Sequence, residues 1–196
     1  DALPNIDFVM SVGIPNDVDP DLAYDVQMAL MLEHTTKPLV FVTNDLDSCR
    51  RAIDMAAVVA GGQESLREQQ HILLYSEPSS PLQQSETAVD KLLLMAETEL
   101  PVVHSPGPLM GGTAPITIAG GLVMSLAEIL SGLVVHQMTN PGAPFIFGAG
   151  LHHMDMRSAQ ICYGGPEFQL TKAAMAQLGR WYGMPTWGYA GCSDAK

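Results

Sequence analysis

Several side chains in this sequence could support chemistry, and most of them follow short apolar runs. His104 ends the run PVVH and precedes SPGPLMGG, so it could donate a hydrogen bond or act as an acid or base. In the segment HHMD, His152 or Asp155 could face a site. Alternatively, all three are loop or structural residues that form hydrogen bonds with nearby backbone.

The segment HHMD does not predict a metal centre. Side chains of adjacent histidines diverge, and no second His or Cys pair follows at metal-ligand spacing. We therefore expect no metal. Cys192-Ser193-Asp194 lacks the G-x-S-x-G pattern of a nucleophile and has no histidine fixed beside it. Ser193 is a candidate substrate-binding residue only.

Two further groups could contact a ligand. Gly111 and Gly112 allow tight turns and close helix packing, or the approach of backbone to a large planar cofactor; the Lys and spacing of a phosphate loop are missing. Aromatic side chains lie in or near several apolar runs, and about half should point inward. They either pack a core or line a site for a quaternary ammonium, for which Trp187 and Tyr189 are the best candidates.

The elements that position these residues alternate regularly. We predict strands at 6–15, 37–45, 71–78, 101–108, 144–150 and 184–191. Helices are predicted at 19–35, 45–62, 85–99, 119–139 and 165–183, with a helical turn at 63–70. Ser85 is the expected N-cap of the third helix, and Gly61-Gly62 and Gly183 are expected helix stops.

This alternation predicts an α/β fold with a parallel sheet. An open doubly wound sheet and a (β/α)8 TIM barrel both satisfy it, but no G-x-G-x-x-G follows the first strand. All six runs end in small or polar residues, as at the mouth of a barrel. Because six units are two short of closure, we expect residues 1–196 to form a single partial (β/α)8 barrel domain of about six βα units, truncated at both ends.

The charge is distributed unevenly. The chain has a net charge of −12, with 17 acidic and 5 basic residues in 1–100 and 4 of each in 101–196. An acidic chain without basic clusters argues against nucleic acid and anionic membranes, and is compatible with a cationic ligand. Three distant cysteines without a CxxC motif suggest a reducing, cytoplasmic setting.

Residues 118–138 form the most apolar window of the chain and contain Glu128 and His136. The window is long enough to span a membrane. We expect a buried helix instead, because of Glu128, the glycines and the globular flanks. A buried carboxylate needs a partner, and Arg157 is the expected one.

Three segments together resemble the trimethylamine methyltransferase family of corrinoid-dependent methyltransferases. They are GGTAPITIAGGLVMSLAEILSGLVVHQMTNPGAPFIFG at 111–148, MDMRSAQICYGGPE at 154–167 and MAQLGRWYGMPTWGYAGCSDAK at 175–196. The resemblance is densest over 101–196 and looser over 1–100, where PNIDF and the βα rhythm agree.

The resemblance implies a barrel enzyme that moves a methyl group from trimethylamine, or from a quaternary amine such as glycine betaine, to the cobalt of a corrinoid. It implies that the corrinoid is carried on a partner protein and not bound directly, and we expect the full-length enzyme to be a homo-oligomer. Some members use pyrrolysine, which this sequence does not contain. Either this is a relative without pyrrolysine, or the relevant codon follows Lys196.

Two other interpretations are open. Another TIM-barrel enzyme, of lyase or aldolase type, would need a strand-end lysine or metal carboxylates, and the strand ends contain no lysine. A non-catalytic barrel could bind amines or a corrinoid protein. Residues 1–196 alone are expected to be inactive, because two strands and their loops are missing.

Overall fold

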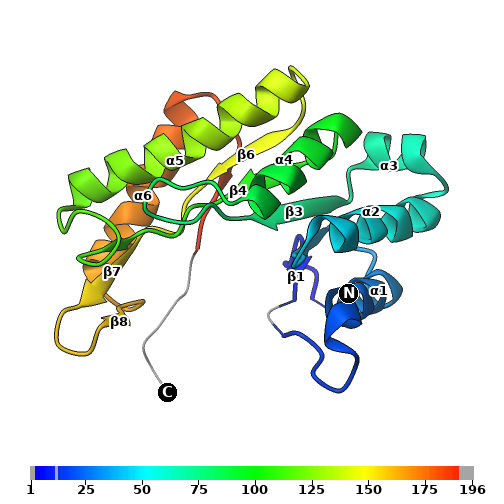
Figure 1. The fold of residues 1–196 in the computed structure, drawn as a ribbon, viewed down its shortest axis with the longest axis horizontal. Coiled ribbons are helices and arrows are strands. Elements are labelled where there is room, and N and C mark those ends of the chain that lie inside the picture. Colours follow the sequence, from blue (N-terminus) through cyan, green and yellow to red (C-terminus); the bar gives the residue numbers. More distant parts are fainter. Residues whose placement is uncertain (1–2, 12, 190–196) are drawn as a thin grey trace.

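A computed structural model describes residues 3–11 and 13–189, and its centre is a six-stranded parallel sheet (Figure 1). The strand order is β1-β2-β3-β4-β6-β9, so the strands follow one another in chain order. They are β1 (Val9–Met10), β2 (Leu39–Phe41), β3 (Ile72–Ser76), β4 (Val102–His104), β6 (Phe145–Gly148) and β9 (Thr186–Trp187). The prediction of a parallel sheet with six strands is confirmed, although each strand is shorter than predicted, and helices follow the first five strands among the described residues.

Six helices cover one face of this sheet. They are α1 (Ala23–His34), preceded by the 3-10 turn η1 (Pro20–Leu22), α2 (Leu46–Ala60), α3 (Gln63–Gln69), α4 (Glu86–Thr98), α5 (Ile118–Thr139) and α6 (Pro166–Trp181). Ser85 caps α4 by accepting the Ala88 N–H, and Gly61 ends α2 at φ +89°, both as predicted. The cap of α6 is Tyr182, and the predicted stop Gly183 follows it at φ +69°.

The sheet is curled into a half-barrel. In the part of the chain that the structure describes, β1 pairs only with β2 and β9 pairs only with β6, so both edges are open. The ribbon nevertheless forms an arch (Figure 1). Rings from its two ends meet. The ring centroid of Phe8, next to β1, lies 5.4 Å from that of Trp187 in β9.

The two faces of the sheet bury different side chains. Outward-pointing residues such as Leu74, Val102 and Phe147 pack under the helices and form the main core. The side chains between them in sequence point into the arch, because neighbours on a strand alternate. Beneath Trp187, at the N-terminal ends of the strands, these inner side chains line an apolar hollow of about 400 Å³.

Two predicted loops contain short strands. β5 (Leu109–Met110) pairs in parallel with β7 (His152–Asp155), and β7 pairs antiparallel with β8 (Gln160–Ile161). Both segments lie between the strands and helices that the sequence predicts. β5 and β8 have two residues each and β7 has four, HHMD, which does not alternate between apolar and polar residues, so no strand pattern marks them in the sequence.

The buried carboxylate of α5 has different partners from those expected. Glu128 is 1% exposed and accepts hydrogen bonds from Ser80 Oγ at 2.9 Å and from the Leu82 N–H at 2.7 Å. The expected partner Arg157 instead lies in the exposed turn between β7 and β8. Sequence could not show this pairing, because the 79–84 segment reaches α5 only in the folded chain. Glu128 therefore ties that segment to the helix layer.

Helix α5 has the length and the apolar composition of a membrane span, and 28% of its most apolar window is buried. In the structure it lies against α4, β4 and β6, with Glu128 and His136 on its buried side. At the middle of this contact Gly132 meets His104 of β4. A methyl group added at Gly132 would lie 2.4 Å from His104 Cδ2.

We predict that Gly132→Ala lowers the thermal stability of the full-length protein. Overpacking a buried site costs on the order of 1–3 kcal/mol, more than the ~1 kcal/mol that alanine gains over glycine in a helix. Gly13→Ala is the control, because nothing lies within 4 Å of the added methyl group. An unchanged Tm for Gly132→Ala would contradict the close approach of α5 to β4.

Candidate functional site

Aromatic side chains form a continuous row on the inner face of the sheet. The ring of Trp187 lies 5.4 Å from Phe8 and 6.1 Å from Tyr75. The hydroxyl of Tyr75 in turn hydrogen-bonds the hydroxyl of Tyr189, which follows β9. The structure thus brings the two predicted aromatic residues, Trp187 and Tyr189, to one place at the C-terminal ends of the strands.

A carboxylate completes this row. The Tyr75 hydroxyl donates to Glu77 Oε1, and Glu77 is exposed at the end of β3. Burial first, and then the charge of Glu77, raise the pKa of Tyr75 above its usual value; burial also raises the pKa of Tyr189. Both phenols therefore stay protonated near neutral pH. Glu77 places a negative charge beside aromatic faces, an arrangement that suits a cation.

His152 lies beside Tyr189 on the other side of the row. Its ring is 5.5 Å from Tyr163, 5.6 Å from Phe168 and 6.1 Å from Tyr189. Burial lowers the pKa of His152 to about 4, and the nearby charges of Lys172 and His153 act in the same direction. His152 is therefore neutral at pH 7 and offers an aromatic ring with no positive charge.

Lys172 of α6 limits where a second cation could bind. Its Nζ lies 4.9 Å from the ring centroid of Tyr189 and 4.4 Å from that of Phe168. The same ammonium donates to the Leu151 carbonyl at 3.0 Å and to the Ala149 carbonyl at 3.4 Å. Because like charges repel, a cationic ligand should lie on the Tyr75 and Trp187 side, near Glu77.

His104 does not point into the arch. Its side chain is fully buried between β4 and α5, where Nε2 lies 3.1 Å from Gln84 Oε1. Burial lowers its pKa to about 4, with a contribution from His136. The alternation along β4 directs His104 outward and Val103 inward. These contacts turn the His104 side chain away from the arch, so they do not support the prediction that His104 binds substrate.

Asp155, Gly111 and Gly112 lie outside the aromatic row. Asp155 accepts hydrogen bonds from the Arg157 N–H at 2.8 Å and the Ser158 hydroxyl at 3.0 Å, which lower its pKa and hold the β7–β8 turn. Gly111, at φ +87°, and Gly112 form the tight turn after β5. Ser193 lies outside the described residues. The ligand roles of these four residues remain predictions.

Sequence reasoning missed two charged members of the site. Glu77 lies two residues after Tyr75, but nothing in the sequence showed that Tyr75 points inward. Lys172 belongs to a helix, whereas the sequence interpretation considered lysines only at the ends of strands. The side chain reaches the strand-end carbonyls from α6, which no spacing rule reveals.

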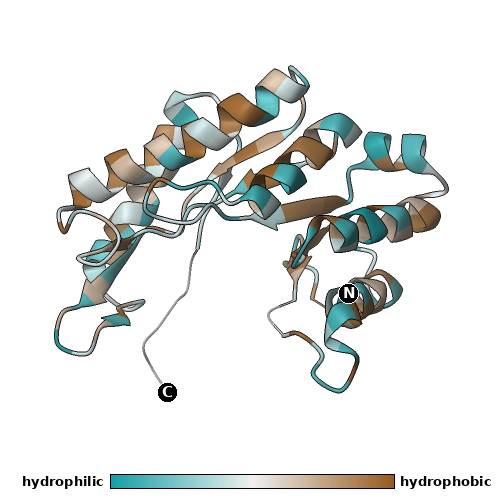
Figure 2. Ribbon diagram, viewed as in Figure 1, coloured by the Kyte–Doolittle hydropathy of each residue, from teal (hydrophilic) through white to brown (hydrophobic). Residues whose placement is uncertain are grey.

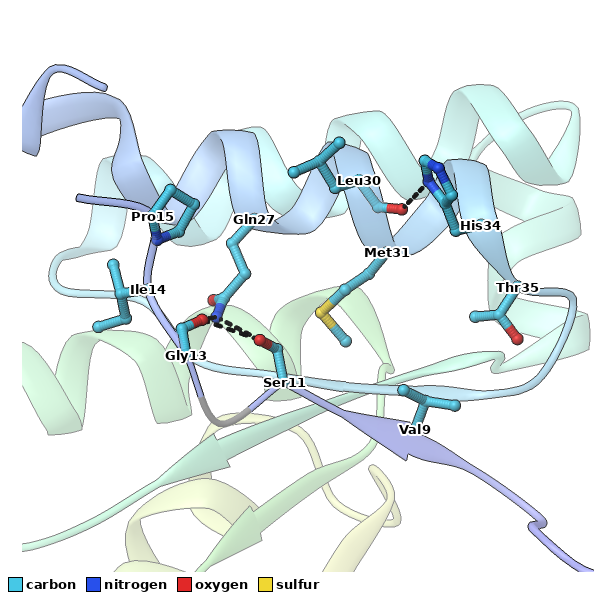
Figure 3. A pocket seen from close by; sticks show the side chains of 10 residues that line it. All are labelled: Val9, Ser11, Gly13, Ile14, Pro15, Gln27, Leu30, Met31, His34 and Thr35. Carbon is cyan, nitrogen blue, oxygen red and sulfur yellow. Dashed lines mark hydrogen bonds between the residues drawn. The ribbon is translucent and has the colours of Figure 1, made fainter. Parts of the chain in front are cut away.

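A second hollow, of about 670 Å³, lies between β1 and α1 (Figure 3). Its polar contacts are internal: Gln27 Nε2 donates to Ser11 Oγ at 2.9 Å and to the Gly13 carbonyl, and His34 Nδ1 lies 2.9 Å from the Leu30 carbonyl. The hollow borders the open edge of β1. Because its polar groups bond one another, we assign no ligand to this hollow. Among the described residues, no three His, Cys, Asp or Glu side chains are grouped to hold a metal ion.

Comparison with known proteins identifies relatives along the whole chain. Residues 4–196 match the family model of trimethylamine methyltransferase (MTTB). Trimethylamine methyltransferase MttB of Desulfitobacterium hafniense (strain DSM 10664 / DCB-2) is 31% identical over 100% of this chain and 40% of its own length. Glycine betaine methyltransferase of Desulfitobacterium hafniense (strain Y51) is 30% identical over 93% of this chain and 38% of its own length.

An archaeal relative gives the same result. Trimethylamine methyltransferase MttB of Methanosarcina barkeri is 31% identical over 100% of this chain and 40% of its own length. The chain therefore spans about two fifths of the length of these curated relatives. The aromatic row and Glu77 belong to the part that the chain shares with them.

We predict that the folded state loses stability as the pH falls from about 6.5 to about 4. Burial lowers the pKa values of His104, His136 and His152 to about 4, so between these pH values the unfolded chain binds protons that the folded chain does not. Urea unfolding of the full-length protein at a series of pH values measures the effect. His136→Gln should reduce the slope, whereas a stability that stays constant from pH 7 to pH 4.5 would contradict these pKa shifts.

Proposed function

Because this chain belongs to the trimethylamine methyltransferase family, we propose that the full-length protein transfers a methyl group from a methylated amine to the corrinoid of a separate protein. The observation that supports this proposal is the row of Trp187, Tyr75 and Tyr189, with Glu77 bonded to the Tyr75 hydroxyl. A quaternary ammonium has no N–H to donate and is recognised by aromatic faces and negative charge. The row supplies both.

In the proposed reaction a C–N bond of the amine breaks and a bond from the methyl carbon to the acceptor forms. The corrinoid of the partner protein supplies the nucleophile. The nitrogen keeps the electron pair of the broken bond and leaves as a neutral amine when the substrate is a quaternary ammonium or trimethylammonium, the protonated form of trimethylamine. Such a leaving group needs no acid, which fits a site whose histidine is neutral and whose phenols stay protonated.

The residues of this chain would bind and orient the substrate. Trp187 and Tyr75 would hold the methylated nitrogen, and Glu77 would balance its charge. The Tyr75–Tyr189 hydrogen bond fixes both rings, so the cation meets a preformed surface. The proposed substrate is trimethylamine or a quaternary amine such as glycine betaine. The relatives' names state trimethylamine and glycine betaine.

We also infer that the sheet closes into a (β/α)8 barrel in the full-length protein. The open edges of β1 and β9, the hollow beside β1 and the Phe8–Trp187 contact across the arch support this inference. Two further βα units would pair with these edges and complete the mouth. The site would lie in the cytoplasm, in keeping with a reducing environment for the three cysteines.

The direct test mixes the full-length protein with a reduced corrinoid protein and a candidate amine. Trimethylamine, glycine betaine and choline are compared, and formation of methylcorrinoid is followed by its absorption spectrum. We expect transfer from at least one of the three. If none of them methylates the corrinoid, the proposed function is wrong. Residues 1–196 alone should give no transfer, because part of the mouth is missing.

We predict that Tyr75→Leu weakens binding of the methylated amine by roughly 3- to 30-fold, the worth of a cation–aromatic contact of ~0.5–2 kcal/mol. Tyr75→Phe keeps the ring and loses only the hydroxyl bonds to Glu77 and Tyr189, so its effect should be smaller. Calorimetric titration of the full-length protein measures both. Equal losses for Leu and Phe would show that the hydroxyl matters and the ring face does not.

We predict that Glu77→Gln also weakens binding of the cationic substrate, since the variant keeps the shape of the side chain and removes its charge. Raising the salt concentration should likewise weaken binding of the amine to the wild-type protein, because salt screens the attraction between the two charges. Glu97→Gln, at an exposed position on α4, is the matched control. If the two variants bind the amine alike, Glu77 does not balance the substrate charge.

A further inference from the structure

Glu128 is the only Asp, Glu, Lys or Arg of helix α5, and its side chain is buried. In Figure 2 this helix is mostly brown and pale, whereas α3 is teal along most of its length. Among residues 3–11 and 13–189, no Lys, Arg or His forms an ion pair with the carboxylate. Burying a carboxylate is costly unless hydrogen bonds compensate for the lost water. The donors that bond Glu128 therefore indicate its role.

Both donors belong to one turn, in the loop between β3 and α4. Ser80 Oγ donates to Oε2 of Glu128 at 2.9 Å, and the Leu82 N–H donates to Oε1 at 2.7 Å. The turn is closed on itself, because the Ser79 N–H donates to the Gln83 carbonyl at 2.9 Å and the Gln83 N–H donates back at 3.1 Å. Glu128 thus holds the tip of a closed turn.

The tip of this turn has a backbone conformation that needs support. Leu82 has φ +55°, in the left-handed region that a leucine rarely adopts, and its side chain is 66% exposed. Such a conformation persists only where the surrounding contacts impose it. The bond from the Leu82 N–H to Glu128 is such a contact. Without the carboxylate, we expect the turn to relax and move.

The end of the same loop is fixed in another way. Gln84 Nε2 donates to Ser131 Oγ of α5 at 2.9 Å, and Gln84 Oε1 lies 3.1 Å from His104 Nε2. Ser85 then caps α4. These bonds do not involve the Glu128 side chain. Loss of the carboxylate should therefore loosen the turn at 79–83 and leave α4 in place.

Glu77 lies just before this turn. The chain leaves β3 at Ser76, whose carbonyl accepts the Ser105 N–H at 2.8 Å, and three residues later it enters the turn at Ser79. Glu77 is exposed between these two fixed points, and its carboxylate accepts the Tyr75 hydroxyl. If the turn moves, Glu77 loses one of the two points that place its side chain beside Tyr75.

We propose that Glu128 is a positioning residue for the binding site: by holding the turn at 79–83, it keeps the Glu77 carboxylate beside the Tyr75 ring. The inference rests on the proposed function, in which Glu77 balances the charge of a methylated amine. Glu128 itself belongs to the helix layer, on the opposite face of the sheet from the aromatic row, and bonds the turn. It acts on the ligand only through Glu77.

Two variants of the full-length protein separate the hydrogen bonds of Glu128 from its charge, with tetramethylammonium as the probe in calorimetric titration. Glu128→Ala removes both acceptors and should weaken binding by roughly 2- to 5-fold, the worth of one exposed ion pair. Glu128→Gln keeps an oxygen for the Leu82 N–H and offers an NH₂ group to the Ser80 hydroxyl, which can accept. It should bind like the wild type. Equal losses in both variants would overturn the proposal, because the charge would then act directly.

A double variant tests the route through Glu77. If Glu128 acts through Glu77, then Glu77→Gln and Glu77→Gln/Glu128→Ala should bind tetramethylammonium equally well. Losses that add in the double variant would overturn the proposal. Hydrogen exchange of residues 77–84 should also be faster in Glu128→Ala than in the wild type or Glu128→Gln. Unchanged exchange in Glu128→Ala would contradict the hold of Glu128 on the turn.

Leu66→Ala is the control for a general loss of stability. Leu66 is fully buried where α3 packs on α2, so this variant should lower the Tm and leave tetramethylammonium binding unchanged. An equal loss of binding in Leu66→Ala and Glu128→Ala would overturn the positioning role, as would a wild type that binds no tetramethylammonium. A wild type that binds the probe but methylates no corrinoid would contradict the proposed function alone.

Discussion

Side chains along each parallel strand alternate between the helix layer and the inside of the arch, and this alternation decides where each functional side chain can point. In β3, Leu74 and Ser76 lie under the helices, and Tyr75 between them enters the interior. In β4 the same alternation turns His104 outward against Gly132 of α5. The interior therefore receives aromatic rings, and the helix layer receives the histidine. Glu128 adds to this layer, because its hydrogen bonds fasten the 79–84 segment to α5.

Much of the architecture could be predicted from the sequence. Apolar runs alternating with capped amphipathic stretches predicted six parallel strands in chain order and the helices between them, because both signals are local. Trp187 and Tyr189 were found as aromatic residues near the last strand. Successive side chains of a strand point to opposite faces of the sheet. An error of one residue in the strand boundary therefore reverses which side chains point inward, which is why His104 was expected at the mouth. Glu77 and Lys172 join the site through contacts between distant segments, and no local pattern encodes them.

The electrostatics of the site rest on groups that burial keeps uncharged. His152 is neutral at pH 7, and the phenols of Tyr75 and Tyr189 remain protonated, so Glu77 and Lys172 provide the fixed charges. Glu77 is bonded to the Tyr75 hydroxyl, and the Lys172 ammonium lies over the Tyr189 ring. A cation at the row is therefore drawn toward Glu77 and away from Lys172. Under the proposed function, this difference would orient an amine as well as hold it.

The contacts that build the row also set the order in which the protein can fold. Tyr75 and Tyr189 are 114 positions apart, and Phe8 and Trp187 come from the two ends of the described chain. Closing so long a loop is entropically unfavourable until the intervening βα units have formed and shortened the path. Neighbouring strands, by contrast, pair over short separations, so the sheet can grow unit by unit. The aromatic row is thus assembled late in folding, and a partly folded chain would have a helix layer but no binding surface.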